Sequence, residues 1–120
     1  MSEPRSALEE KVVEAALGAR DEVVGLVADL VACDTTARLP GEPARDDEKL
    51  QRMLAARLAQ LVARTDLWEP APTGAGSRFL PAGLDFAGRP QLAAVLRGAG
   101  GSRSLLLNGH IDAVDVAPRE

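Results

Sequence analysis

Aromatic side chains are almost absent from this chain, and their scarcity limits the core that it can build. Its 120 residues include one Trp, two Phe and no Tyr. The core must therefore consist of Leu, Val and Ala, whose burial contributes about 25 cal/mol per Å² of apolar surface. A chain of this length is expected to form one domain, and small aliphatic side chains leave that domain a thin margin of stability.

The N-terminal segment has the sequence pattern of a helix. Ser6 and Glu9 have the spacing of a capping box, in which each side chain bonds to the backbone amide of the other residue. Apolar residues then recur three and four positions apart, which predicts one helical face over 6–32. Gly18 and Gly25 weaken this pattern and allow a kink or a division into two helices.

The remaining elements are a second helix and three strands. The helix is predicted over 46–63, with acidic residues in its first turn, where they favour the positive end of the helix dipole. Strands are predicted near 65–69, 91–97 and 104–109, and the Pro- and Gly-rich residues 70–88 read as a loop. The last strand is continuously apolar, which is typical of a sheet covered on both faces. This order of elements predicts an α/β or α+β layer structure.

Composition excludes several classes of protein. The only cysteine, Cys33, rules out an internal disulfide and is expected to be a buried, inert thiol. No basic stripe with interleaved aromatic residues is present, so nucleic-acid binding is not expected. The N-terminus is acidic and no long apolar run follows it, which argues against a signal peptide or a membrane span. A cytoplasmic location is the default expectation.

The stretch that carries chemistry is residues 105–114, LLLNGHIDAV, which holds the only histidine. His110 and Asp112 are two positions apart, so an extended backbone directs both side chains to the same face. Imidazole is a common zinc ligand, and a zinc-bound His usually donates its other N–H to a carboxylate or carbonyl. Asp112 could orient His110 in this way. As an isolated pair, a structural contact is favoured over a metal site, because zinc needs at least three protein ligands.

The wider stretch resembles the His-x-Asp motif of the zinc hydrolase family that includes acetylornithine deacetylase, succinyl-diaminopimelate desuccinylase, aminoacylase and carboxypeptidase G. Members commonly show an apolar strand, a small residue, His, an apolar residue, Asp and then Val-Pro. Two further stretches are similar to the family in the same order: residues 34–36 with the Pro40-Gly41 turn that follows, and residues 88–96. The resemblance covers about residues 21–118.

This resemblance implies a fold and a catalytic site. Residues 1–120 would be the incomplete N-terminal portion of a mixed-sheet, zinc-aminopeptidase-like catalytic domain, with two helices and about three strands. His110 would bind zinc or another divalent metal, one of two ions in the complete family site. Asp112 would be the catalytic residue that orients or tunes His110. In the family a metal-bound water attacks the amide carbonyl, a Glu acts as general base, and the metal lowers the pKa of that water.

The resemblance also implies partners. The substrate would be an N-acyl amino acid or small peptide, cleaved by a deacetylase or deacylase type of reaction. Members are often homodimers, through a domain that lies outside residues 1–120.

The sequence departs from the family pattern after the motif. Asp115 stands where the family usually has Pro, and the other family ligands and the general base are expected downstream of residue 120. Asp115 and Glu120 are interpreted as exposed loop carboxylates rather than as substitutes. Two other functions stay open: a non-catalytic binding or regulatory module that retains the front end of this fold, and a small complete enzyme. The second is disfavoured, because a lone His cannot close a usual zinc site.

Overall fold

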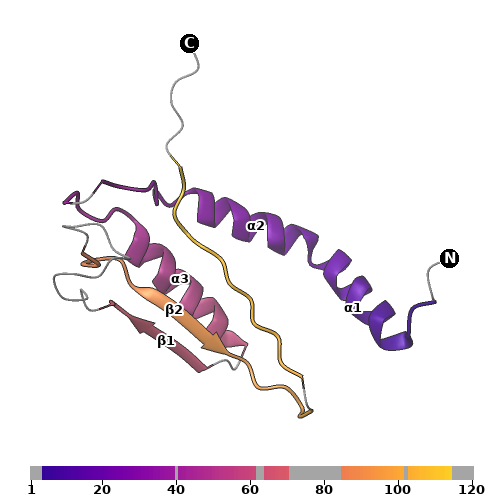
Figure 1. The fold of residues 1–120 in the computed structure, drawn as a ribbon. Coiled ribbons are helices and arrows are strands. Elements are labelled where there is room, and N and C mark those ends of the chain that lie inside the picture. The colour runs from indigo at the N-terminus through magenta and orange to yellow at the C-terminus, as the bar shows by residue number, and fades with distance from the viewer. Residues whose placement is uncertain (1–3, 40, 62–63, 71–84, 102, 115–120) are drawn as a thin grey trace. The chain divides into compact units, whose positions relative to one another are not determined.

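The computed structural model describes residues 4–39, 41–61, 64–70, 85–101 and 103–114 (Figure 1). Within these residues it contains three helices and one two-stranded antiparallel sheet, a small mixed α/β arrangement. The chain divides into two compact units, Met1–Ala32 and Cys33–Glu120. No helix in the described part of the chain is both long and apolar enough to cross a membrane.

The first unit consists of helices α1 (Ala7–Gly18) and α2 (Arg20–Val31). The predicted capping box is present: Ser6 Oγ accepts from the Glu9 amide at 3.3 Å, and the Ser6 amide donates to Glu9 Oε2 at 2.7 Å. The Ser6 amide, and the Ser6 hydroxyl that donates to Glu9 Oε2 at 2.8 Å, lower the pKa of Glu9. The single helix expected over 6–32 is divided at Ala19, which is one of the outcomes that Gly18 and Gly25 allow.

The apolar face of these two helices is exposed, and neither helix contains a buried residue. Its exposed members are Leu8, Val12, Leu17, Val23, Val24, Val27 and Val31. Helices of this length are marginal in water when they stand alone. The capping box and intrinsic helix propensity are therefore the local features that favour α1 and α2.

The second unit packs helix α3 (Asp47–Gln60) against strands β1 (Arg64–Trp68) and β2 (Gln91–Val95). The strands pair in antiparallel register, with Arg64 opposite Val95 and Trp68 opposite Gln91. The predicted helix over 46–63 and the predicted strands near 65–69 and 91–97 correspond to these three elements. Residues 62–63, at the end of the predicted helix, lie outside the described part of the chain, as do residues 71–84 of the predicted loop.

The core of the second unit is small. Leu50, on α3, is 3% exposed, and Cys33 is buried as expected. The other buried residues among those described are Pro90 and the polar Thr35 and Gln51. This composition agrees with the expectation that few large side chains are available to fill an interior. Polar contacts therefore contribute a large share of the local order in this unit.

The prediction of a third strand near 104–109 is wrong. Residues 103–112 are extended but belong to no ladder, and Figure 1 draws them as a plain trace without an arrow. Leu105, Leu106 and Leu107 are 82%, 90% and 82% exposed. A strand exists only when its backbone N–H and C=O groups are paired. Among the described residues the sheet contains β1 and β2 alone, so this apolar segment has no partner strand.

Candidate functional site

The His-x-Asp stretch is held by the segment that follows α2. The Thr35 hydroxyl donates to the carbonyl of Ile111 at 2.6 Å, and the Ala113 amide donates to the carbonyl of Thr35 at 3.0 Å. The Ala37 amide donates to the carbonyl of Ala113 at 2.7 Å, which completes a short parallel bridge. These bonds join residues more than seventy positions apart and fix the backbone on both sides of Asp112.

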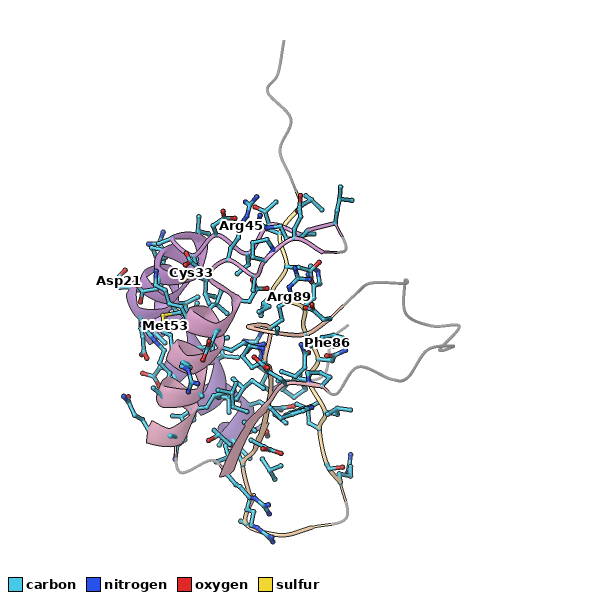
Figure 2. All side chains as sticks on the ribbon, turned by 90° about the vertical axis from the view of Figure 1, so that its left-hand side faces the viewer. Asp21, Cys33, Arg45, Met53, Phe86 and Arg89 are labelled. Carbon is cyan, nitrogen blue, oxygen red and sulfur yellow. The ribbon has the colours of Figure 1, made fainter. Side chains whose placement is uncertain are left out.

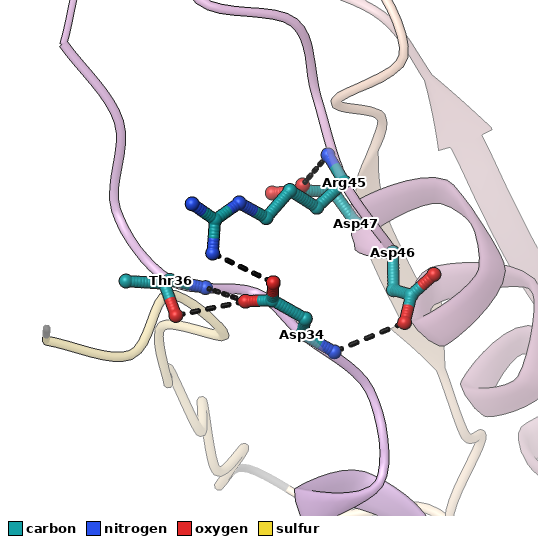
Figure 3. A network of polar contacts seen from close by, with 5 residues as sticks. All are labelled: Asp34, Thr36, Arg45, Asp46 and Asp47. Carbon is teal, nitrogen blue, oxygen red and sulfur yellow. Dashed lines mark hydrogen bonds and ion pairs between the residues drawn. The ribbon is translucent and has the colours of Figure 1, made fainter.

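The same segment is ordered by the carboxylate of Asp34 (Figure 3). Asp34 Oδ1 accepts from the Thr36 hydroxyl at 2.8 Å and from the Thr36 amide at 3.1 Å, which is the local side-chain bonding that the Asp-Thr-Thr sequence predicts. Asp34 Oδ2 lies 2.6 Å from Arg45 Nη1. The Thr36 hydroxyl, the Thr36 amide and the Arg45 guanidinium all lower the pKa of Asp34.

Hydrogen bonds donated by backbone amides connect this turn to the start of α3. The Asp34 amide donates to Asp46 Oδ2 at 3.0 Å, and the Asp46 amide donates back to the Asp34 carbonyl at 3.0 Å. The Arg45 amide donates to Asp47 Oδ2 at 3.1 Å. Acidic residues at the start of α3 therefore accept hydrogen bonds from the turn and also interact favourably with the positive end of the helix dipole.

His110 and Asp112 lie in contact on an exposed surface. His110 Nδ1 is 3.2 Å from Asp112 Oδ1 and 2.9 Å from the main-chain carbonyl oxygen of Asp112. Their side chains are 81% and 60% exposed. The pair is therefore open to solvent, and the backbone that carries His110 is not the end of a strand.

Both residues line a cleft of about 370 Å³ in the second unit. The walls come from the segment after α2, the first turns of α3, the approach to β2 and the His-x-Asp stretch. The lining residues are Thr35, Thr36, Ala37, Arg38, Asp47, Gln51, Phe86, Arg89, Pro90, Gln91, Gly109, His110, Ile111 and Asp112. Figure 2 labels Phe86 and Arg89 on the segment that leads into β2.

The side chains of this cleft fit a zinc site only in part. The contact between His110 Nδ1 and Asp112 matches the arrangement of a zinc-bound imidazole, whose second nitrogen donates to a carboxylate or carbonyl. His110 Nε2 is then the nitrogen available to a metal. However, the described residues contain no group of three His, Cys, Asp or Glu side chains that could hold an ion. The pair fits one ligand position of a zinc site and not a complete site.

Two features of the cleft have no signal in local sequence patterns. Thr35 holds the His-x-Asp stretch through its hydrogen bond to the carbonyl of Ile111. A Thr-Thr pair after a helix does not predict that distant partner. Arg38 and Arg89 line the cleft from segments far apart in the sequence. Asp115 and Glu120, interpreted as exposed carboxylates, lie outside the described residues.

The class of protein is not fixed by comparison with known proteins. No protein-family model, curated protein or solved structure matches the chain. The cleft and the residues that line it are therefore the evidence for the function of this chain.

Proposed function

We propose that this chain forms the N-terminal part of a zinc-dependent hydrolase that cleaves amide bonds of N-acyl amino acids or small peptides. The observation that carries the proposal is the His110–Asp112 pair, an exposed imidazole with Nδ1 against a carboxylate at the wall of a cleft. The resemblance of the surrounding sequence to zinc amidohydrolases supports the same reaction. A zinc-aminopeptidase-like catalytic domain, a cytoplasmic location and a homodimeric assembly belong to this proposal as well.

The role of the two residues follows from their contact. A proton on Nδ1 can be donated to Asp112, which leaves the lone pair of Nε2 for a metal and fixes the plane of the ring. Zinc bound there would lower the pKa of a water and polarise the scissile carbonyl. The described residues supply no group of three ligands, so the proposal requires further ligands and a general base from outside them. In the resembling family these serve a pair of metal ions.

The alternative is a non-catalytic binding or regulatory module that uses the same cleft. The observation that favours it is the absence of a closed metal-ligand group from the described residues. A cleft of about 370 Å³ falls in the size range of small-molecule sites. The two functions differ in whether amide hydrolysis depends on zinc and on His110.

Amine release by the native gene product decides between these functions. The protein purified from its source cells, with its intact mass measured, is incubated with a panel of N-acyl amino acids in the presence and absence of zinc. We expect zinc-dependent release of free amine, reduced to background by His110→Ala. Asp112→Asn should reduce it by about 10–100-fold, the usual loss for a residue that orients a metal ligand. Arg103→Gln, at an exposed residue outside the cleft, should retain the wild-type rate.

Other outcomes overturn the proposal. A native product that releases no amine from any member of the panel with zinc present would favour the binding module. Full activity of His110→Ala would remove His110 from the metal site. Clear turnover by residues 1–120 alone, lost in His110→Ala, would show that this chain completes its own site.

A further inference from the structure

We propose that the cleft beside His110 holds a monocarboxylate, with the guanidinium of Arg38 as its anchor and that of Arg89 as a second donor. The inference deepens the proposed function and rests on it in one respect, because it takes this carboxylate to be a group of the substrate. Binding itself rests only on the contacts within the cleft.

Arg38 is the first observation. It lines the cleft, and its Nε is shielded from solvent without a hydrogen-bond partner among the described residues. An arginine side chain stays charged, and a shielded donor of a charged group is costly to leave without an acceptor. Unpaired buried polar atoms are uncommon in folded proteins and indicate a missing partner. An acceptor bound in the cleft would remove this defect.

Arg89 is the second observation. It lines the same cleft from the segment before β2, whereas Arg38 comes from the segment after α2. Its Nη2 donates to the main-chain carbonyl of Glu42 at 3.0 Å, which restrains the side chain and uses one of its several donors. The planar fork of a guanidinium matches the two oxygens of a carboxylate. Two such side chains at one cleft would supply the donors of a site for an oxyanion.

The acidic residues of the cleft limit the charge of this anion. Asp47 and Asp112 also line the cleft. Asp47 accepts from the Arg45 amide, and Asp112 lies against His110. Two carboxylates near the anion disfavour a double negative charge, since like charges repel strongly at short range. A planar monoanion therefore fits better than a phosphate dianion.

The experiment measures binding to residues 1–120 without metal. The probes are N-acetylglycine, its uncharged amide and inorganic phosphate. Binding is measured by calorimetry and by the NMR signal of the only imidazole, His110. We expect saturable binding of N-acetylglycine with a shift of the His110 signal. The amide should bind at least about tenfold more weakly, which is the usual effect of losing a charge-assisted hydrogen bond. Phosphate should not displace N-acetylglycine.

Three variants identify the anchor. Arg38→Gln should weaken N-acetylglycine binding to the level of the amide, and Arg38→Lys, which keeps the charge but loses the fork, should fall between. Arg103→Gln removes one positive charge from an exposed residue outside the cleft and should bind as the wild type does. Far-UV circular dichroism of each variant checks that the fold is retained, and Arg38→Lys provides the test if Arg38→Gln does not fold.

Several results would overturn this inference. They are equal binding of acid and amide, absence of saturable binding, tighter binding of phosphate, and wild-type affinity in the Arg38 variants. The outcome is separate from that of the amine-release assay, because no metal and no hydrolysis are involved. Carboxylate binding without zinc-dependent hydrolysis would support the anion site and leave the binding module as the function.

Discussion

At the scale of single residues, Asp34 connects the turn after α2 to the residues that precede α3. Its carboxylate accepts both donors of Thr36 and pairs with Arg45, while its own backbone exchanges two bonds with Asp46. The turn could be predicted from the Asp-Thr-Thr sequence, because an Asp followed by Thr bonds locally. The Arg45 and Asp46 partners could not, because they depend on the course of the loop between α2 and α3.

Asp34 should make the stability of the second unit depend on pH. Its folded pKa is lowered, chiefly by the Thr36 hydroxyl, so the folded state binds this proton less readily than the unfolded chain. The contribution is therefore present above the ordinary carboxyl range and is lost as pH falls through the lowered pKa. Asp34→Asn keeps an acceptor for Thr36 and removes the charge. We expect its urea midpoint to fall less than that of the wild type between neutral and acid pH.

A second variant sharpens the pH measurement. Thr36→Val removes the largest cause of the lowered pKa while Asp34 stays in place. It should also flatten the pH dependence, and the double variant should add little to Asp34→Asn, because both changes act on one interaction. Parallel pH curves for the wild type and Asp34→Asn would contradict this role.

At the scale of elements, local sequence patterns predicted the helices and two of the strands, because these elements depend mainly on neighbouring residues. The capping box of Ser6 and Glu9 and the apolar periodicity located the helices, and β1 and β2 lie where two of the expected strands were placed. The strand expected near 104–109 is absent because strand formation needs a neighbour, which an apolar run does not supply. The contact of Thr35 with Ile111 also has no local signal, since 76 residues separate them.

The bridge between residues 35–37 and 111–113 gives a test at this scale. Thr35→Val keeps the shape of the side chain and removes the hydroxyl that donates to Ile111. We expect the free energy of unfolding to fall by about 0.5–1.5 kcal/mol, the net contribution of one hydrogen bond. Hydrogen exchange at the Ala113 amide should accelerate, because its acceptor is the carbonyl of Thr35.

Thr65→Val is the matched control for this change. Thr65 lies on β1, where a β-branched apolar residue is well tolerated, and the substitution leaves the Thr35–Ala113 bond intact. Its Ala113 exchange rate should equal that of the wild type. Unchanged exchange in Thr35→Val would show that the bridge does not hold the His-x-Asp stretch.

At the scale of the whole molecule, the described residues leave much apolar surface open. Leu105, Leu106 and Leu107 are almost fully exposed, and several apolar side chains of α1 and α2 are more than half exposed. A run of exposed apolar residues in extended conformation, with unpaired backbone groups, is prone to associate with other strands. The scarcity of aromatic residues and the small core around Leu50 point to the same marginal stability.

The candidate site shows the same division between what sequence can and cannot indicate. His110 and Asp112 were found from their spacing and lie in contact, because two positions apart on extended backbone is a local property. Whether they bind zinc stays a prediction. The cleft around them, with Arg38 and Arg89, follows from which distant segments meet, and no spacing rule reveals that.

We predict that His110 binds zinc through Nε2 while Asp112 holds Nδ1. The most direct measurement is the imidazole nitrogen NMR spectrum of residues 1–120 during a zinc titration, because the chain has a single histidine. We expect weak binding, since one imidazole supplies a small part of the energy of a closed zinc site. The Nε2 signal should move while the Nδ1 signal stays, and Asp112→Asn should remove that selectivity. Zinc-induced change at Nδ1, or no change at His110, would contradict the claim.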